Sequence, residues 1–241
     1  MLTRQFVSHV TLRRDTVASF DTYPFSLPAV RSLESLELHP KVTFLVGENG
    51  SGKSTLMEAI AVAMGLNAEG GSRNFNFSTH ASHSELHAHL RIARGFRKPR
   101  TEFFLRAESF YNVASEIERL NVGHYYGEKS LHAQSHGESF LALLMNRFGP
   151  NGLYLLDEPE AALSPQRQLA VLTRLHDLVQ AESQFVIATH SPILMAYPDA
   201  WIYQCDGDGI RRIAYEETEH FQVTRDFLAN PKRMLDMLLE P

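Results

Sequence analysis

The first strongly patterned part of the chain predicts a strand, a glycine-rich loop and a helix in direct succession. Residues 41–46 (KVTFLV) form a β-branched and aromatic run that ends at Gly47, which is typical of a buried strand. From Lys53 onwards, apolar residues keep helical spacing as far as Gly65, a residue suited to a helix end. A helix therefore follows the strand after a short loop.

A second unit of the same kind lies further along the chain. Residues 153–156 (LYLL) and 184–188 (QFVIA) predict two more buried strands. Between them, residues 165–180 predict a helix, with Ser164 as its N-cap and Pro165 in its first turn. A strand–helix–strand unit of this length joins parallel strands by a right-handed crossover. The pattern indicates an α/β fold with a mostly parallel core sheet flanked by helices.

Elsewhere the pattern is less regular, above all between about residues 67 and 131. Residues 85–94 alternate between polar and apolar, which favours a half-exposed strand, although Leu86, Leu90 and Ala93 also fit a helix. Further predictions are a strand over 101–107, a helix over 111–120, a hairpin of 201–205 with 210–213, and amphipathic helices near the C-terminus. The fold is thus expected to include an antiparallel β part and a small helical subdomain.

Length and composition limit the kinds of protein that remain. The 241 residues show no repeat and no linker, so we expect one domain over 1–241, with an insertion or helical lobe over about 67–150. A net charge of −5 argues against a surface built throughout to coat nucleic acid. The single cysteine, Cys205, excludes an internal disulfide and fits a reducing compartment. Without a secretory apolar block or a long apolar run, we expect a cytoplasmic protein with no direct membrane insertion.

The loop after the first strand matches a phosphate-binding motif. Residues 47–54 (GENGSGKS) fit G-x-x-x-x-G-K-[ST] between a predicted strand and a predicted helix. Its glycines would turn backbone N–H groups towards a polyphosphate, Lys53 would reach the β- and γ-phosphates, and Ser54 would offer a hydroxyl to Mg²⁺. The alternative is a glycine-rich turn that binds nothing. The candidate nucleotide-binding residues here are Gly47, Asn49, Gly50, Ser51, Gly52, Lys53, Ser54 and Thr55.

Two acids and a histidine follow the later strands. Asp157 and Glu158 end the run LYLLDE, and the carboxyl ends of strands are where α/β sheets bind ligands. Asp157 is therefore a candidate Mg²⁺ ligand, and Glu158 a candidate to accept a proton from, or orient, the attacking water. An exposed acidic turn before Pro159 is the alternative. His190 closes the next strand and is a candidate hydrogen-bond partner of the γ-phosphate or that water.

A helix start between these motifs carries a capping box. Ser135 and Glu138 stand three residues apart before an apolar helical run, so Ser135 is the predicted N-cap. Capping alone explains this pattern. A serine and a glycine, here Gly137, at an exposed helix start can also bind an anion.

Taken in order, these four motifs resemble those of the ATP-binding-cassette (ABC) ATPases. GENGSGKST is similar to Walker A, SHGES to a divergent signature sequence in place of LSGGQ, LYLLDEP to Walker B and ATHSP to the switch-histidine motif. The resemblance covers roughly residues 36–205. The segment DEPEAALSP resembles the soluble ATPases related to the RecF, SMC and OLD groups, while the 81 residues between Lys53 and Ser135 are too few for long coiled-coil arms.

This resemblance implies a Mg²⁺-dependent ATPase that works as a head-to-tail homodimer and switches a partner in DNA maintenance or defence. Each ATP would lie between the phosphate loop of one copy and Ser135 with Gly137 of the other. Two alternatives stay open: the ATP-binding subunit of a membrane transporter, and a low-turnover nucleotide-gated regulator. The family's Q-loop glutamine is missing after residues 101–107, where Glu108 or Ser109 stands, so Glu108 is a candidate Mg²⁺ ligand or else a solvated loop acid.

Three clusters outside the motifs carry weaker hypotheses. Histidines at 80, 83, 87 and 89 could bind a metal, but no cysteine or carboxylate completes a familiar spacing, which favours a polar strand face or a loop. Tyr23 or Phe25 could stack on adenine by position, with core packing as the alternative. A basic stretch could bind nucleic-acid phosphates or an acidic partner, with a solvated hairpin as the alternative. Its members are Arg91, Arg94, Arg97, Lys98, Arg100 and Arg106.

Overall fold

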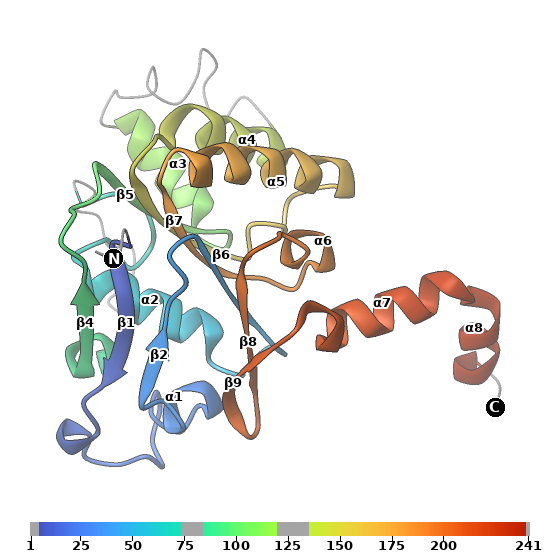
Figure 1. Cartoon of the computed structure of the whole chain (residues 1–241), viewed down its shortest axis with the longest axis horizontal. Coiled ribbons are helices and arrows are strands. Elements are labelled where there is room, and N and C mark those ends of the chain that lie inside the picture. Colours follow the sequence, from blue (N-terminus) through green and yellow to red (C-terminus); the bar gives the residue numbers. More distant parts are fainter. Residues whose placement is uncertain (1–4, 74–83, 120–134, 240–241) are drawn as a thin grey trace.

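The computed structural model describes residues 5–73, 84–119 and 135–239, and within them two sheets form the frame of an α/β fold (Figure 1). The main sheet has the order β5-β6-β7-β3-β8-β9; its strands are parallel except β9, which pairs antiparallel with β8. The side sheet has the order β2-β1-β4 and is antiparallel. The strands of the main sheet are β3 (Val42–Val46), β5 (Thr101–Arg106), β6 (Gly152–Asp157), β7 (Gln184–Ala188), β8 (Trp201–Asp206) and β9 (Gly209–Ile213).

The side sheet and the helices complete the fold. Strands β1 (Val7–Leu12), β2 (Ser35–Glu37) and β4 (Leu90–Arg94) form the side sheet. The helices are α1 (Pro28–Arg31), α2 (Lys53–Ala63), α3 (Phe110–Arg119), α4 (His136–Arg147), α5 (Pro165–Gln180), α6 (Pro192–Met195), α7 (Glu219–Ala229) and α8 (Pro231–Leu239). Short 3-10 turns lie at Arg14–Thr16, Glu85–His89 and Tyr215–Glu217.

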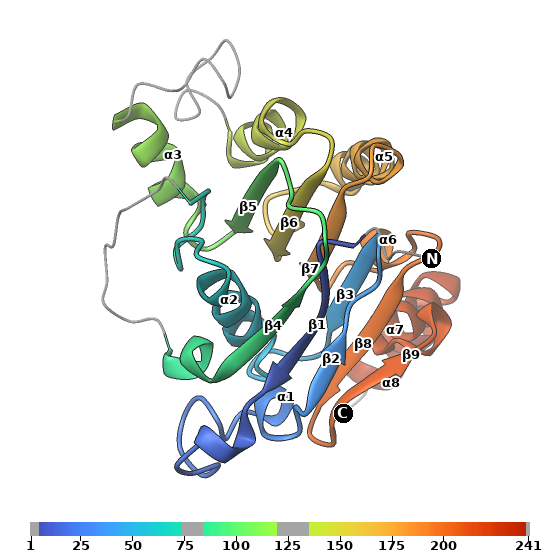
Figure 2. The same ribbon diagram turned by 60° about the vertical axis from the view of Figure 1, so that its left-hand side comes forward.

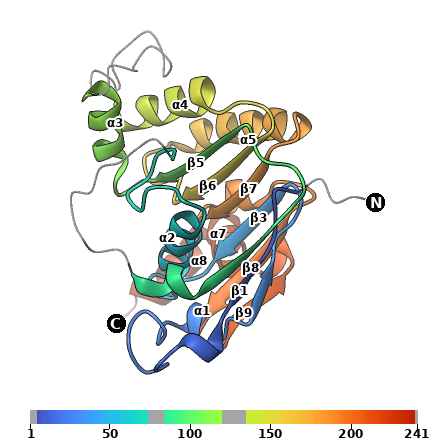
Figure 3. The same ribbon diagram turned by 90° about the vertical axis from the view of Figure 1, so that its left-hand side faces the viewer.

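Helices cover both faces of the main sheet, as Figures 2 and 3 show. Successive residues of a strand point to opposite faces, so fully apolar strands feed two cores. In β6, Tyr154 and Leu156 pack with α3, α4 and α5, whereas Leu153 and Leu155 pack with α2 and the side sheet. The buried central strands hold their carboxyl ends rigidly at one edge of the sheet.

The structure confirms the two predicted strand–helix units and corrects one strand. Residues 85–94 are not a single strand: Glu85–His89 form a 3-10 turn, and only Leu90–Arg94 pair with β1. Pairing with β1 decides where the strand begins, and this partner is distant in sequence. The predicted antiparallel part is present as the side sheet and as the β8–β9 hairpin.

The C-terminal helices form an arm that leaves the body of the molecule (Figure 1). We call α7 and α8 the C-terminal arm. No described residue of either helix is buried. Both are amphipathic, and apolar side chains such as Leu228 and Met237 are exposed on them. Among the described residues, the contacts of the arm with the body lie at its base.

Candidate nucleotide site

Three of the predicted motifs follow neighbouring strands of the main sheet. Strands β6, β7 and β3 lie side by side, with Asp157 level with Ala188 and Ala188 level with Leu45. Because these strands are parallel, the residues that follow them meet at one edge. The phosphate loop, the acid pair and His190 therefore share the carboxyl edge of the sheet.

The phosphate loop has the backbone geometry that its glycines allow. Gly47, Gly50 and Gly52 have φ values of 139°, 82° and 101°, which L side chains rarely adopt. A Cβ on Gly47 would lie 2.0 Å from the carbonyl oxygen of Cys205 in β8, so no larger residue fits there. Gly52 is the N-cap of α2 and has no side chain to accept hydrogen bonds from the first turn. The positive end of α2 is thus left open for an anion.

Lys53 lies in this loop as a buried cation. Its side chain is only 4% exposed, and its ammonium donates to the carbonyl oxygens of Gly47 (2.7 Å) and Glu48 (2.8 Å). Burial lowers the pKa of the Lys53 ammonium. Within the described residues no carboxylate forms an ion pair with it. A buried cation held by carbonyl groups alone is suited to receive a phosphate.

The other loop residues are placed less uniformly. Asn49 is exposed at the rim of the loop, and Thr55 is half-buried in the first turn of α2. Ser51 is 7% exposed, and its buried hydroxyl has no hydrogen-bond partner in the described structure.

The predicted magnesium ligands lie in direct contact. The Ser54 hydroxyl donates to Asp157 Oδ1 at 3.0 Å. Asp157 is 3% exposed, and burial raises the pKa of its carboxyl to about 6, although nearby Arg106 acts to lower it. A hydroxyl and a carboxylate are hard oxygen donors of the kind that Mg²⁺ prefers. The residues present therefore fit this ion.

Arg106, at the end of β5, is an unforeseen neighbour of that pair. Its guanidinium contacts Glu58 (3.0 Å), Glu108 (3.1 Å) and Asp157 (3.6 Å). The parallel register of β5 and β6 puts Arg106 beside Asp157. The sequence analysis had assigned Arg106 to the basic stretch. Glu108 is 81% exposed and meets the site only through this arginine.

Glu158 and His190 face each other across the edge. Glu158 Oε1 lies 3.8 Å from His190 Nε2, and both side chains are partly exposed. Glu158 has a φ of 53°, a strained conformation for a residue with a side chain. Burial lowers the pKa of the His190 imidazole, with the charge of Lys53 acting in the same direction. The Glu158 carboxyl group and the His190 imidazole thus lie side by side next to the phosphate loop.

Two further residues, neither of them a candidate from the sequence, hold His190. Glu160 accepts hydrogen bonds from the Thr189 hydroxyl (2.7 Å) and from the His190 backbone N–H (2.6 Å). His220, on α7, lies with its Nε2 3.0 Å from His190 Nδ1. Glu160 was visible as a second acid after Walker B, whereas nothing local in the sequence connects His220 with His190.

The start of α4, which carries the predicted signature sequence, differs from the start of α2 because a side chain caps it. The Ser135 backbone N–H and hydroxyl both donate to Glu138 Oε2, at 3.0 and 2.7 Å. The Arg167 guanidinium lies 3.3 Å from the other oxygen of Glu138. A Cβ on Gly137 would lie 2.5 Å from the carbonyl oxygen of Ala162. In the described part of the chain, no contact joins this helix start to residues 47–55 of the same copy.

The structure places both candidate adenine-stacking residues and part of the histidine cluster. Phe25 is 3% exposed and packs in the core, which was the alternative to stacking on adenine. Tyr23 is exposed. His80 and His83 lie outside the described residues, while His89 bonds to the Thr16 hydroxyl. Across the described ranges, no cluster of histidine, cysteine, aspartate or glutamate is suited to a metal.

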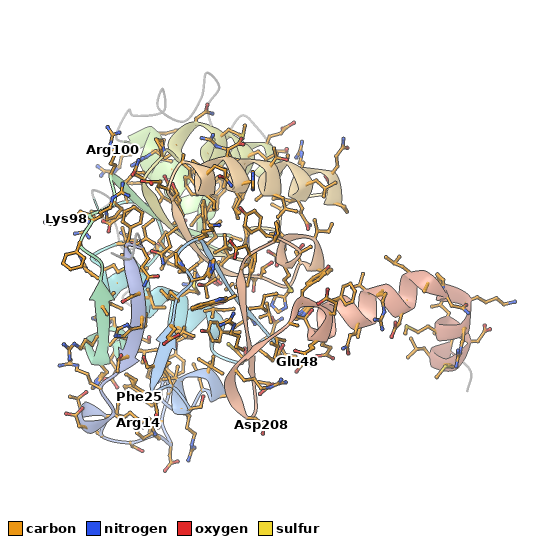
Figure 4. All side chains as sticks on the ribbon, viewed as in Figure 1. Arg14, Phe25, Glu48, Lys98, Arg100 and Asp208 are labelled. Carbon is orange, nitrogen blue, oxygen red and sulfur yellow. The ribbon has the colours of Figure 1, made fainter. Side chains whose placement is uncertain are left out.

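The basic stretch partly lines a cavity of about 610 Å³ near the β4–β5 connection. Figure 4 shows Lys98 and Arg100 there, well away from Glu48 of the phosphate loop. Arg97 is already paired with Glu182 at 2.6 Å. Residues of the stretch in the cavity wall are Arg94, Arg97, Lys98 and Arg100, joined by Arg73 and Arg147; Arg91 is exposed on β4 outside it.

Strand, phosphate loop and helix, with an acid pair and a histidine on neighbouring strand ends, define a P-loop nucleotide-binding fold. Comparison with known families agrees. A model described as "AAA domain" matches residues 22–133, and one described as "AAA domain, putative AbiEii toxin, Type IV TA system" matches residues 119–196. Together with the four ordered motifs, these matches support a P-loop ATPase of the ABC type.

Individual relatives are distant. ABC transporter G family member 22 of Arabidopsis thaliana is 25% identical over an alignment of 174 positions, which covers 63% of this chain and 23% of that protein. The chain thus spans about a quarter of the length of this curated relative. The SMC head domain from Thermotoga maritima is 15% identical, with a TM-score of 0.47 over 87% of this chain and 98% of that one. CbiO1 from Clostridium perfringens, part of the ABC transporter complex cbiONQ, is 16% identical, with a TM-score of 0.48 over 98% and 100%.

No helix within the described ranges combines the length and the hydropathy that a membrane span requires.

Proposed function

We propose that this chain binds and hydrolyses ATP with Mg²⁺, as one ATPase domain over residues 1–241 whose insertion, at about 67–150, carries the signature helix. The main support is the open start of α2 beside Lys53, a buried cation that has only carbonyl partners in the described structure. Such a site is electrostatically incomplete without an anion.

The residues divide the chemistry among them. The N–H groups of the loop and the Lys53 ammonium bind the β- and γ-phosphates, Lys53 exchanging its carbonyl partners for phosphate oxygens. Glu158 accepts the proton of the attacking water, and His190 Nε2 donates to a γ-phosphate oxygen. Their 3.8 Å separation lets both side chains face one reacting centre.

Ser54 and Asp157 would hold the magnesium ion, which would neutralise charge on the phosphates. Asp157 must be ionised to do so, and the guanidinium of Arg106 beside it favours that form. Glu108 contacts Nη2 of the guanidinium whose Nε lies nearest to Asp157, so its proposed role at the metal is indirect.

The complete site would need two copies of the chain arranged head to tail. Ser135 and Gly137 contact Glu138 and Ala162 of their own copy rather than its phosphate loop. An exposed Ser135 at a helix start is free to meet the γ-phosphate bound by another copy. ATP binding would then close the dimer, and hydrolysis would release it.

The partner that such a switch acts on is proposed to belong to DNA maintenance or defence. The description of the second family model names a toxin of a toxin–antitoxin system, which favours defence. The basic cavity suits nucleic-acid phosphates. We expect DNA or RNA to stimulate hydrolysis, and replacing Arg97, Lys98 and Arg100 by glutamine to abolish that stimulation while leaving the basal rate unchanged.

A transporter subunit is the second candidate, favoured by the match to an ABC transporter of Arabidopsis thaliana. Co-purification with an integral membrane protein would support it. Tight ATP binding without measurable turnover would instead indicate a nucleotide-gated regulator.

The dimer proposal is tested with Glu158→Gln, which removes the proton acceptor and keeps the side-chain shape. At saturating ATP and Mg²⁺, light scattering should give twice the monomer mass. The double variant Lys53→Ala/Glu158→Gln is the control and should stay monomeric. A monomeric Glu158→Gln protein with ATP bound would contradict the two-copy site.

A further inference from the structure

The imidazole of His190 is held by a second imidazole from the C-terminal arm. His190 Nδ1 and His220 Nε2 lie 3.0 Å apart, and the two ring centroids are 5.1 Å apart with a tilt of 57°. His220 is the second residue of α7, thirty residues further along the chain. A contact of this length requires one nitrogen to donate and the other to accept.

The base of α7 is anchored where His220 needs it. Thr218, the N-cap, is fully buried; its hydroxyl accepts from the Phe221 N–H (3.3 Å) and donates to the Tyr215 carbonyl oxygen (2.7 Å). The Tyr215 hydroxyl donates to the carbonyl oxygen of Pro192 at 2.9 Å. Pro192 begins α6, two residues after His190. The two histidines are therefore fixed to the same part of the body.

The backbone of His190 is fixed as well, which leaves its ring orientation to His220. Glu160 binds the His190 backbone N–H at 2.6 Å and the adjacent Thr189 hydroxyl at 2.7 Å. In the described structure the other ring nitrogens, His190 Nε2 and His220 Nδ1, are buried without hydrogen-bond partners. Among the described residues, the His220 ring makes the one hydrogen bond to the His190 imidazole, and the Glu158 carboxyl lies further off, 3.8 Å from His190 Nε2.

The pair opens onto a pocket next to the phosphate loop. This pocket, of about 630 Å³, lies between Glu48 and Asn49 of the loop and Val223 and Thr224 of α7, with Glu158 in its wall. Figure 1 shows α7 leaving the body from this side. The first turns of the arm thus form a wall of the space beside the proposed γ-phosphate position.

The positions of the ring protons determine which histidine donates in the contact between His190 and His220. Burial lowers the pKa of both imidazoles, so both are neutral near pH 7 and each carries one ring proton. To donate to a phosphate oxygen, His190 must carry its proton on Nε2, which leaves Nδ1 as an acceptor. His220 must then donate from Nε2. A donor at this place selects the tautomer of His190 that the proposed chemistry needs.

We propose that His220 is a positioning residue for His190, through which the C-terminal arm sets the orientation and tautomer of the imidazole that faces the γ-phosphate. This inference rests on the proposed function. It makes the arm part of the ATPase mechanism, because a movement of α7 that withdraws His220 removes the donor from His190.

Two substitutions of His220 distinguish the loss of its hydrogen-bond donor from a change in the shape of its side chain. His220→Phe keeps an aromatic ring and removes both nitrogens, whereas His220→Gln keeps an N–H donor at a similar reach. We expect His220→Phe to lower kcat about tenfold with KM for ATP unchanged, because only a transition-state contact is lost. His220→Gln should restore most of the rate. Arg225→Ala, one turn further along α7 and exposed, is the matched control and should behave as the unaltered chain.

The His190→Ala variant connects this test to the proposed function. It should lower kcat at least as much as His220→Phe, and the double variant should show no further loss, because both act through one imidazole. Nitrogen-15 NMR of the nucleotide-free protein should find His190 in the Nε2–H form, and a mixture of tautomers in His220→Phe.

A normal rate in His220→Phe beside a slow His190→Ala enzyme would overturn this inference and leave the proposed function standing. Equal losses in His220→Phe and His220→Gln would reduce His220 to a packing residue and overturn it as well. A normal rate in His190→Ala would overturn the role of both histidines.

Discussion

Helices α2 and α4 both begin with residues suited to binding an anion. Their first turns differ in whether a side-chain carboxylate already accepts hydrogen bonds there. Helix α2 begins at Gly52, which has no capping side chain, next to the buried Lys53. Helix α4 begins at Ser135, where the carboxylate of Glu138 accepts two hydrogen bonds and is itself approached by Arg167. Within the described residues, no side chain caps the first helix start, whereas a carboxylate of the chain already accepts hydrogen bonds at the second.

This difference indicates which helix start would bind phosphate within one copy and which would bind it only when a second copy is present. In the proposed function, the start of α2 binds phosphate by itself, because its N–H groups and the Lys53 ammonium can all donate to one anion. The start of α4 is stable without a ligand, so it gains from a phosphate only when another copy brings one to the exposed Ser135. A folded monomer with half a site at each helix is the expected resting state.

The largest effect should come from removing the cation at the start of α2. Lys53→Ala should weaken ATP binding by about 100-fold or more, since charge-assisted hydrogen bonds to two phosphates are lost. Fluorescence titration with a labelled ATP analogue measures this. Lys232→Ala, on the exposed arm, is the control and should bind normally. Equal affinity in both variants would remove the phosphate-loop assignment.

A smaller effect is expected from changing the charge at the start of α4. Asp and Asn are both good N-caps, so Ser135→Asp and Ser135→Asn should both keep the helix. Ser135→Asp places a second carboxylate next to Glu138, and urea unfolding should show that this costs less than about 1 kcal/mol. Only the aspartate would repel a phosphate, and we expect it to slow hydrolysis about tenfold or more. Binding of ATP to the monomer should not change in either variant. Steady-state hydrolysis at saturating ATP distinguishes them, and identical rates would exclude Ser135 from the site.

Burial of the Asp157 carboxyl should lower the free energy of unfolding of the nucleotide-free protein. A free aspartate ionises near pH 3.8, whereas burial raises the pKa of Asp157 to about 6. Between these values the folded state binds the extra proton, so the carboxyl lowers the free energy of unfolding as the pH rises from 4 to 6, and the loss persists above 6.

Asp157→Asn should therefore stabilise the nucleotide-free protein at pH 8 by about 1–3 kcal/mol, seen as a Tm several degrees higher. The gain should shrink towards pH 5. Asp208→Asn, in an exposed turn, should show no such change. Thermal unfolding across this pH range measures both, and a Tm that is lower at pH 8 would contradict the proposed cost of burying Asp157.

The smallest effect concerns Gly137, in the first turn of α4. Helix propensity alone predicts that Gly137→Ala gains up to about 1 kcal/mol. The carbonyl oxygen of Ala162, 2.5 Å from the added Cβ, predicts instead a loss of about 1–3 kcal/mol. Gly207→Ala is the control, because nothing lies within 4 Å of its Cβ position. Urea unfolding that shows a gain for Gly137→Ala would mean that this contact relaxes freely.

The sequence predicted the contiguous parts of the site and missed those joined by tertiary contacts. A phosphate loop can be recognised because strand, glycines and lysine are adjacent, and Asp157 because it ends an apolar strand. Arg106 reaches Asp157 only through the register of two parallel strands, and His220 reaches His190 only because α7 is anchored at its base. No local pattern reports either contact.

The fold shows the same limit. The central strands are apolar on both faces and were predicted to within a residue or two. Strands β1 and β2 were not located, because their pairing with each other and with Leu90–Arg94 is decided by partners far away in the chain. Without that pairing, the 3-10 turn at Glu85–His89 and the strand after it read as one alternating run.

Mixing two impaired variants tests most directly whether two copies share each ATP. Lys53→Ala retains an intact α4 start, and Ser135→Asp retains an intact phosphate loop. In a head-to-tail heterodimer these two intact halves meet at one of the two sites. We predict that an equimolar mixture hydrolyses ATP several times faster than the average of the separate variants. A rate equal to that average over a wide range of protein concentrations would show that each copy works alone and would contradict the shared site.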